Sequence, residues 1–382
     1  AHEERKPLLK QDLLTPLNTM VNNTSQKYLD SINNTRPVEK AGKLRLDAAE
    51  GLFELPQRFT DKLHNIGLGD ISSLPDRNST EIKIAISKFL SLEIDNISVF
   101  SGSDEVIETI PRIYLNPSDV SLCIVPTFSR MVTCPKKIGC EVKLFFLAKD
   151  HGLKLDEVLF KELVEQIKLN RPKTVWICSP NNPTGIIVEL SKIEKLVKEF
   201  PETLFIVNEV YQEYFSLDPQ DSSASLVNEN ANLLVIRSFS KAFGLAGMRI
   251  GYVVGNKERI SEIEKLRTMY NLSSISQTFA IEALKDTEYL SDMVKFVKTE
   301  RERVLKILSS DYNNIEFVPE SNSNLLLIKH KNKDLFQELY DKNAFASDWR
   351  NADGIKGEGF IRISIGQKNQ NDRIISLFKE IN

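Results

Sequence analysis

Short, continuous apolar runs recur along the chain and alternate with longer stretches of helical periodicity. A continuous apolar run of this length is typical of a strand buried on both faces. The runs lie at residues 97–100, 120–125, 141–146, 174–178, 204–207, 232–236 and 248–254. Amphipathic stretches of helix length lie between them, at residues 103–115, 156–168 and 190–199. This alternation predicts an α/β fold with a mostly parallel, seven-stranded sheet.

The pattern changes on both sides of this region. Residues 44–48 predict a short strand, and a helix is expected over residues 79–90 with Ser79 as its N-cap. After residue 270 come a long helical stretch and two further apolar runs, at 286–308, 324–328 and 360–365. They predict a smaller α+β domain. We therefore expect an N-terminal arm over 1–45, a large domain over 46–270 and a C-terminal domain over 271–382.

The stretch from Ser238 to Tyr252 carries the most suggestive chemistry. Ser238 and Ser240 follow an apolar strand, Lys241 comes next, and Arg249 lies after a glycine-rich bend. Two hydroxyls and a guanidinium can hold a phosphate, and a lysine beside them can form an imine with a carbonyl cofactor. The alternative is an ordinary surface turn with a solvated lysine.

A second candidate anion site follows the apolar run at 97–100. The chain breaks there at Ser101-Gly102-Ser103-Asp104, and a helix is expected to begin. Free backbone N–H groups at a helix N-terminus attract anions. The alternative is a plain connection between a strand and a helix.

Composition narrows the classes of protein. Of 382 residues, 41% are apolar and 27% charged, which is typical of a globular enzyme. The net charge of −3 comes from 50 basic and 53 acidic residues, so we expect neither nucleic acid nor a membrane as a partner. No apolar run is long enough to span a membrane, and no signal-peptide core is present, so a cytoplasmic location is expected.

Cysteine usage agrees with that location. Four cysteines occur without C-x-x-C spacing, and only four histidines accompany them, so we expect reduced thiols and no metal site. The chain begins at Ala1. Residues 1–19 are interpreted as added sequence or a processed extension, with Met20 as a plausible native start.

The chain resembles class I/II pyridoxal-phosphate aminotransferases of fold type I, most closely their histidinol-phosphate aminotransferase branch. The resemblance covers roughly residues 40–375. It rests on an ordered set of motifs: GSDE at 102–105, PTF at 126–128, NNPTG at 181–185, NEVY at 208–211, SFSKAFGLAGMRIGY at 238–252 and IRISIG at 361–366. Each motif alone is weak, but the ordered set at successive strand ends is specific.

The resemblance implies roles for individual residues. Lys241 would form the imine with pyridoxal 5'-phosphate and carry protons. Arg362 would pair with a substrate carboxylate, which suits its fork of donors. Phe128 would stack on the cofactor ring, and Asn182 and Tyr211 would bind its 3-hydroxyl. The phosphate or its approach would be held by Ser103, Asp104, Ser238, Ser240 and Arg249. The family also implies a homodimer.

One departure from the family concerns the cofactor ring. Relatives place an aspartate, which pairs with the protonated ring nitrogen, where this chain has Asn208. A carboxylate in contact raises the pKa of a cation by roughly one to three units. Asn208 cannot supply this charge, so we expect a less protonated ring and slower chemistry. The alternative is that Glu209 or a water compensates.

Other departures concern the phosphate and the substrate. Leu74 stands where relatives carry a tyrosine that reaches the partner's cofactor phosphate. The arginine that relatives use for the substrate phosphate aligns near Ser347-Asp348, with Arg350 shifted nearby. Arg130 is an extra cation after Phe128. We hypothesise that Arg130 or Arg350 binds a substrate anion in a different pose, which makes histidinol phosphate a doubtful substrate.

The sequence therefore predicts an aminotransferase for a small amino or keto compound, with or without a phosphate group. The alternative enzyme is a decarboxylase of a phosphorylated amino acid of the phosphoserine or phosphothreonine type. A transcription regulator with an aminotransferase-like domain is disfavoured, because only about 45 polar residues precede the fold. A binding protein without activity is disfavoured because Lys241 is retained.

Overall fold

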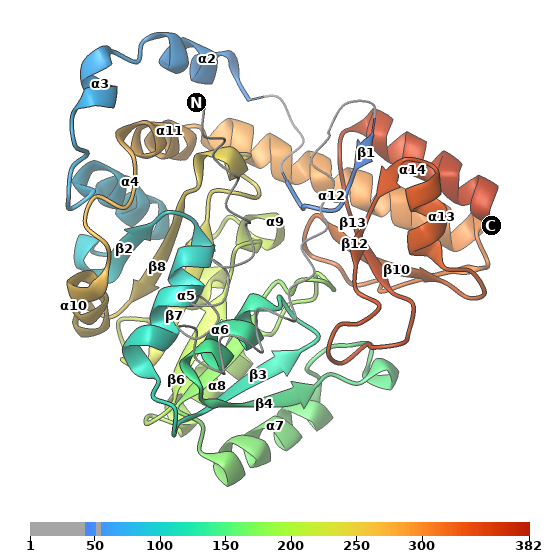
Figure 1. Ribbon diagram of the computed structural model, residues 1–382, viewed down its shortest axis with the longest axis horizontal. Helices are drawn as coiled ribbons and strands as arrows, with labels where there is room; N and C mark the ends of the chain where they lie inside the picture. The colour runs from blue at the N-terminus through green and yellow to red at the C-terminus, as the bar shows by residue number, and fades with distance from the viewer. Residues whose placement is uncertain (1–42, 51–54) are drawn as a thin grey trace, which may run out of the picture. The chain divides into compact units, whose positions relative to one another are not determined.

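The computed structural model describes residues 43–50 and 55–382. The expected arm over residues 1–45 and the interpretation of residues 1–19 and Met20 lie outside these residues, apart from 43–45. The described residues form two main sheets with their helices (Figure 1). The larger sheet carries the predicted site, and the smaller sheet belongs to the C-terminal part of the chain.

The larger sheet has seven strands, as the sequence predicts, and their order is β2-β8-β7-β6-β5-β3-β4. The strands are β2 (Ile97–Phe100), β3 (Val120–Val125), β4 (Glu141–Phe146), β5 (Thr174–Cys178), β6 (Leu204–Asn208), β7 (Leu233–Ser238) and β8 (Gly251–Gly255). Neighbours from β7 to β4 pair in parallel. Strand β8 is antiparallel to both β7 and β2. Strand β2 therefore runs in the same direction as β7.

The apolar runs become strands because both faces of the sheet are covered. Every residue of β5, β6 and β7 is buried. A continuous run of branched and aromatic side chains suits such a strand. Edge strand β4 is different, because Glu141 and Lys143 expose their side chains and form an ion pair at its start. Charges on an edge strand discourage pairing with a further strand.

Helices connect these strands much as the periodicity predicts (Figure 1). They are α2 (Gln57–His64), α3 (Leu68–Ser72), α4 (Thr80–Leu90), α5 (Ser103–Tyr114), α6 (Arg130–Ile138), α7 (Glu157–Asn170), α8 (Leu190–Glu199), α9 (Gln212–Phe215), α10 (Lys257–Leu266) and α11 (Ser274–Lys285). Helix α5 begins directly after β2, and its first turn lies next to the start of β8.

The expected N-cap of α4 is wrong in its chemistry. Ser79 occupies the position before the helix, but it has a left-handed backbone (φ 51°) and its side chain makes no capping bond. Asp76 acts instead, since its carboxylate accepts from Asn78 N at 3.0 Å and from Thr80 N at 2.6 Å. Aspartate accepts backbone N–H groups at a helix start as readily as serine does.

The C-terminal part contains a four-stranded antiparallel sheet in the order β12-β13-β10-β9. Its strands are β9 (Ile315–Phe317), β10 (Leu325–His330), β12 (Ser347–Asp348) and β13 (Ile361–Ser364). Its helices are α12 (Thr287–Asp311), α13 (Leu335–Asp341) and α14 (Lys368–Ile381). The short strand β1 (Leu44–Arg45) pairs in parallel with β11 (Ala344–Phe345). Residues near the start of the described chain therefore lie against its C-terminal part.

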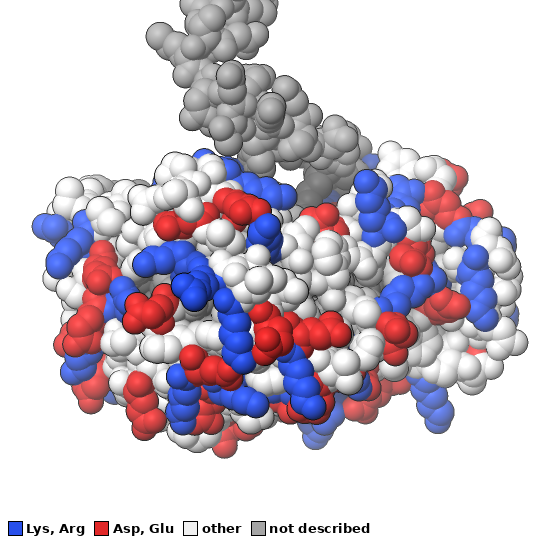
Figure 2. Space-filling view, turned by 90° about the horizontal axis from the view of Figure 1, so that it is seen from below, with Lys and Arg blue, Asp and Glu red and all other residues white. Residues whose placement is uncertain are grey.

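Charged side chains of both signs are interspersed over the face shown in Figure 2. Among the described residues, no helix is both long and apolar enough to cross a bilayer.

Candidate active site

The predicted site residues gather at one edge of the larger sheet. Parallel strands β3, β5, β6 and β7 all end there, and the loops after them carry the PTF, NNPTG, NEVY and SFSK motifs. Because β2 runs in the same direction as β7, it also ends at this edge, and antiparallel β8 begins there. In open α/β sheets, ligands bind beyond the carboxyl ends of the strands.

Close backbone packing brings two groups that attract anions together at this edge. A Cβ on Gly251 would lie 2.3 Å from Ser103 N, and a Cβ on Gly102 would lie 2.6 Å from Arg249 Nη2. Only glycine at both positions lets Arg249 and the first turn of α5 come so close. The amino end of α5 thus meets a guanidinium, a combination that favours a phosphate.

Ser238 and Ser240 lie at the same edge, and we call the five predicted phosphate residues the phosphate cup (Ser103, Asp104, Ser238, Ser240 and Arg249). Ser238 Oγ donates to Ile250 O at 3.3 Å and accepts from Ser240 N at 3.1 Å. This bond fixes the turn after β7. Asp104 lies at the rim, with Oδ2 3.8 Å from Arg249 Nη2.

The lysine lies on the turn directly after the cup. Lys241 Nζ donates to Ala49 O at 3.1 Å and lies 5.4 Å from the centre of the Tyr211 ring. Burial and, secondly, the nearby positive charge of Arg362 lower its pKa from 10.5 to about 7. About half of the amine is therefore neutral near pH 7, and a neutral amine can act as a nucleophile or a base.

Arg362 joins the smaller sheet to this edge. It is buried on β13, its Nη1 donates to Asn182 Oδ1 at 2.8 Å, and its Nη2 donates to Asp47 O. It also lies close enough to contribute to lowering the pKa of Lys241, and to oppose in part the rise that burial causes in the pKa of Tyr211. The structure thus brings together the four residues Lys241, Tyr211, Asn182 and Arg362.

The backbone of residues 46–49 contributes to the site, and the sequence did not predict this contribution. Ser364 N donates to Leu46 O at 2.9 Å, which aligns the segment with β13. The carbonyls of Asp47 and Ala49 then accept from Arg362 and Lys241. The predicted strand at 44–48 was the available signal, but backbone carbonyls leave no mark in a residue pattern.

Asn208 lies at the end of β6 and is 2% exposed. Its Oδ1 accepts from Val210 N at 3.4 Å, and its Nδ2 lies 3.6 Å from Met131 Sδ. Glu209 does not stand in for the missing aspartate. Its carboxylate is already bound by Arg237, Ser222 Oγ and Ser223 N, at 3.2, 2.5 and 2.7 Å.

The aromatic residues lie on loops at the same edge. Tyr211 is fully buried, and burial raises the pKa of its hydroxyl. Phe128 is half-buried on the loop after β3. Thr127 beside it donates to Asn181 Oδ1 at 3.1 Å, which ties this loop to the NNPTG loop. Stacking of Phe128 on a cofactor ring stays a prediction.

The two additional arginines are engaged by carboxylates. Arg130 Nε lies 3.3 Å from Asp104 Oδ1, at the rim of the phosphate cup, and its Nη2 lies 3.0 Å from Glu108 Oε2. Arg350 Nη2 pairs with Asp348 at 2.9 Å and Nη1 pairs with Asp334. Within the described residues, we find no hydrogen bond or ion pair joining Arg350 to the other predicted site residues.

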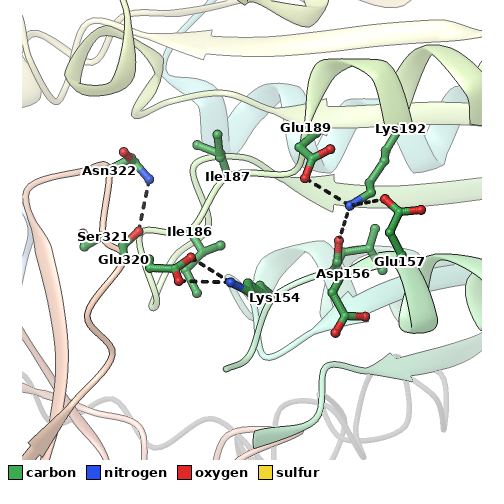
Figure 3. Close-up of a pocket in the computed structure, with 11 residues that line it drawn as sticks. Lys154, Asp156, Glu157, Ile186, Ile187, Glu189, Lys192, Glu320, Ser321 and Asn322 are labelled. Carbon is green, nitrogen blue, oxygen red and sulfur yellow. Dashed lines mark hydrogen bonds and ion pairs between the residues drawn. The ribbon is translucent and has the colours of Figure 1, made fainter. Parts of the chain in front are cut away.

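A cavity of about 620 Å³ lies beyond the NNPTG loop (Figure 3). None of the predicted site residues lines it. Its cations are paired: Lys154 with Glu320 at 3.0 Å, and Lys192 with Glu189 at 3.2 Å. Asn322 on its wall donates its backbone N–H to Gly185 O at 2.6 Å. A Cβ on Gly185 would lie 2.0 Å from Ser321 Oγ. Ser321 and Asn322, from the C-terminal part of the chain, thus pack directly on the NNPTG loop.

An amine kept partly neutral beside a phosphate cup, at the carboxyl edge of such a sheet, defines a fold type I pyridoxal-phosphate enzyme. The sequence profile of the family "Aminotransferase class I and II" matches residues 43–378, and the chain belongs to this family.

Individual relatives agree with this assignment. The histidinol-phosphate aminotransferase of Thermoanaerobacter pseudethanolicus is 30% identical over 364 residues, covering 95% of this chain and 99% of the relative. The crystal structure of histidinol-phosphate aminotransferase from Sinorhizobium meliloti in complex with pyridoxal-5'-phosphate superposes with a TM-score of 0.82 at 20% identity, covering 95% and 100%. The crystal structure of L-threonine-O-3-phosphate decarboxylase from Porphyromonas gingivalis superposes with a TM-score of 0.76 at 19% identity, and the match covers 88% of this chain and 98% of that chain.

The residues present fit pyridoxal 5'-phosphate, the cofactor of the family. The cup would offer a helix N-terminus, two hydroxyls and a guanidinium to the phosphate, and the amine of Lys241 lies on the adjoining turn. When bound, the cofactor supplies the electron withdrawal that lets a bond at the substrate Cα break.

Proposed function

We propose that this aminotransferase acts on small amino and keto compounds with an anionic group that Arg362 binds. The observation that carries the proposal is the position of Arg362. It is buried, its guanidinium is fixed by Asn182 and by Asp47 O, and its charge reaches Lys241. A carboxylate bound there would bring its Cα towards the amine. Arginine suits this task because its fork of donors matches a carboxylate.

The residue roles follow from the chemistry each side chain offers. Lys241, neutral in part at pH 7, would take the proton from the substrate Cα and return it elsewhere. The phosphate cup would fix one end of the cofactor. Asn182 and Tyr211 would bind its ring hydroxyl and Phe128 would stack on the ring. Holding the substrate by fixed groups supplies much of the rate enhancement, because the reacting atoms are already aligned.

Asn208 would tune the ring. A neutral amide cannot stabilise a protonated ring nitrogen as a carboxylate does, and Glu209 is committed to other partners. We therefore infer a less protonated ring and weaker electron withdrawal than in relatives with aspartate at this position.

The substrate differs from histidinol phosphate in this proposal. Ser347-Asp348 replaces the arginine expected there, and Arg350 is paired with Asp348 and Asp334. Arg130 lies beside Asp104 at the cup, so it is the better candidate to meet a second anionic group of the substrate. That role would require Arg130 to exchange a carboxylate partner for the substrate.

We further infer a homodimer. Large apolar side chains are exposed on α3, just after it and after α10, namely Leu68 (86%), Ile71 (66%), Leu74 (73%) and Met269 (57%). The two segments adjoin, because Arg267 Nη2 donates to Arg77 O at 2.9 Å. Exposed apolar groups of this kind mark interfaces, and a second copy fits the family. The four free, buried cysteines agree with a reducing cytoplasmic location.

The experiment begins with the spectrum of the purified protein loaded with pyridoxal 5'-phosphate. We expect visible absorbance that is lost in Lys241→Met, and bleaching by amino donors that release a keto product. Absorbance that is unchanged in Lys241→Met after borohydride treatment would contradict the proposal. Decarboxylation is the alternative, because Arg362 and Lys241 would serve it equally. Phosphoserine and phosphothreonine distinguish the two: release of carbon dioxide indicates the decarboxylase, and a keto product the aminotransferase.

A further inference from the structure

A buried arginine lies under the active-site edge without touching the predicted ligands. Arg237 precedes Ser238 on β7, so its side chain leaves the opposite face of that strand. Its Nη1 lies 3.2 Å from Glu209 Oε2 and its Nη2 lies 2.7 Å from Glu213 Oε1. All three side chains are at most 3% exposed. We call this group the Arg237 triad.

The two carboxylates flank Tyr211 in the sequence. Glu209 stands two residues before it and Glu213 two residues after it. The helix that follows Tyr211, α9, has only four residues and cannot stabilise itself by its own hydrogen bonds. The position of Tyr211 therefore depends on anchors on both sides, and Arg237 supplies both of them from the neighbouring strand.

Tyr211 is also the aromatic neighbour of the amine. The centre of its ring lies 5.4 Å from Lys241 Nζ. Lys241 follows Arg237 by four residues on the turn after the same strand. Strand β7 thus leads into the turn that carries Lys241 and, through Arg237, also binds the segment that carries Tyr211.

We propose that the Arg237 triad is a positioning device that fixes the ring of Tyr211 beside the amine of Lys241 and keeps water from it. The proposal rests on the roles given to Lys241 and Tyr211 under the proposed function. Arg237, Glu209 and Glu213 act through Tyr211 and touch no reacting atom.

The energetics favour a positioning role over a stabilising one. Two carboxylates share one guanidinium, so the buried group carries an excess negative charge. Glu213 Oε2 and Arg237 Nε are also buried without a hydrogen-bond partner among the described residues. Buried ion groups of this kind are often no more stable than apolar replacements, because desolvation offsets the attraction. What the Arg237 triad can provide is a fixed position for the residues that it joins.

The chain offers a matched control in the Lys192 cluster (Figure 3). Lys192 is 6% exposed, and its Nζ lies 3.0 Å from Leu155 O and 3.2 Å from both Glu157 and Glu189. It is likewise a buried cation between two carboxylates, but these carboxylates are 75% and 61% exposed, and neither flanks a predicted site residue. Lys192→Met should therefore lower the stability of the protein without changing the pKa of the Lys241 amine.

The experiment measures the amine in the cofactor-free protein. The rate at which acetic anhydride modifies Lys241 is followed against pH, by mass spectrometry of the peptide that contains it. We expect a midpoint near pH 7 in the parent protein, in line with its lowered pKa. Glu213→Gln and Arg237→Lys should raise the midpoint by about one unit or more, because a displaced Tyr211 lets water reach the amine. Lys192→Met should leave it unchanged.

A double-mutant cycle tests the route through Tyr211. In a Tyr211→Ala background, Glu213→Gln should shift the midpoint no further. A full shift in that background would overturn the proposal. The proposal would also be overturned if Glu213→Gln and Arg237→Lys fold and keep the midpoint of the parent protein. They would then lose stability alone, as Lys192→Met does. The test uses Arg237→Lys, which keeps the positive charge, so it does not depend on whether Arg237→Met can fold.

This result is distinguishable from failure of the proposed function. The midpoint is measured without cofactor or substrate, whereas the proposed function depends on the visible absorbance lost in Lys241→Met. The triad proposal can therefore fail while the assignment of Lys241 stands.

Discussion

The two ends of the active site are built in different ways. The phosphate cup comes from segments that the larger sheet already places side by side, at the end of β2, the end of β7 and the start of β8. The substrate end depends on Arg362 of the smaller sheet, whose guanidinium is fixed by the carbonyl of Asp47 and by Asn182, a predicted ligand of the cofactor ring. The first end requires one sheet, and the second requires contacts with the smaller sheet. Cofactor retention and substrate binding should therefore be separable by mutation.

Lys241→Met removes the group on which both ends converge and should have the largest effect. Activity should fall below detection, because the imine and the proton transfer both depend on this amine. The visible absorbance of bound cofactor should be lost on dialysis. Retained absorbance and turnover would contradict the convergence of the two ends on this amine.

The same variant should have the opposite effect on the cofactor-free protein. The pKa of Lys241 is lowered to about 7 in the folded protein and is near 10.5 when unfolded. Between these values the unfolded state binds more protons, so the contribution of Lys241 to stability rises with pH. Lys241→Met should therefore be more stable than its parent at pH 7, with the difference vanishing above pH 10.5. Urea unfolding at several pH values measures this.

Arg362→Leu should break only the substrate end. The loss of two charge-assisted hydrogen bonds to a carboxylate is worth about 3–4 kcal/mol, so kcat/KM should fall roughly 100- to 1,000-fold. The cofactor absorbance should persist, because the cup is untouched. Arg259→Leu, which removes an ion pair with Glu262 on α10, serves as the control. If Arg362→Leu lost cofactor as strongly as it lost kcat/KM, the two ends would not be separable.

Gly251→Ala should break the cup first. Its Cβ would lie 2.3 Å from Ser103 N and 2.4 Å from Gly102 C, both backbone atoms that cannot turn aside. We expect a stability loss of about 1–3 kcal/mol and cofactor affinity weakened about tenfold. Gly247→Ala is the matched control, since nothing lies within 4 Å of its Cβ. Thermal unfolding and cofactor titration measure both effects, and equal behaviour of the two variants would argue against the cup.

Asn208→Asp should have a smaller effect, through the ring alone. A carboxylate at this position would favour the protonated ring by roughly one to three pKa units. We expect an altered absorbance spectrum and a half-reaction that is several-fold faster. No spectral change and no gain in rate would show that the amide does not face the ring nitrogen.

Arg130→Ala should have the smallest effect. Its side chain is 30% exposed and paired with Asp104 and Glu108, and such pairs are worth about 0–1 kcal/mol. We expect the KM for a doubly anionic substrate to rise by up to about fivefold. An untouched KM would remove Arg130 from the substrate end and leave it as a support of the cup.

The same contrast explains what the sequence could predict. Strands β3, β4 and β5 have the predicted bounds, because continuous apolar runs specify buried strands directly. The cup could be anticipated because its parts follow strand ends, as Ser238 and Lys241 do. The NNPTG loop and Arg362 were identified only through resemblance to a family.

Other features could not be predicted, because they depend on contacts distant in sequence. The capping of α4 by Asp76 in place of Ser79 depends on the path of the loop before it. The Arg237 triad requires knowing that β6 and β7 are neighbours. The carbonyls of Asp47 and Ala49 reach the site because β1 pairs with β11. A residue pattern records side chains, whereas these contacts use backbone groups or join segments that are distant in the sequence.

The NNPTG loop is held near both of its ends by residues from the C-terminal part of the chain. Arg362 donates to Asn182 at one end, and Asn322 donates to Gly185 at the other, where no side chain would fit. A shift of these C-terminal residues would therefore displace the NNPTG loop as well, so the loop and Arg362 are coupled mechanically.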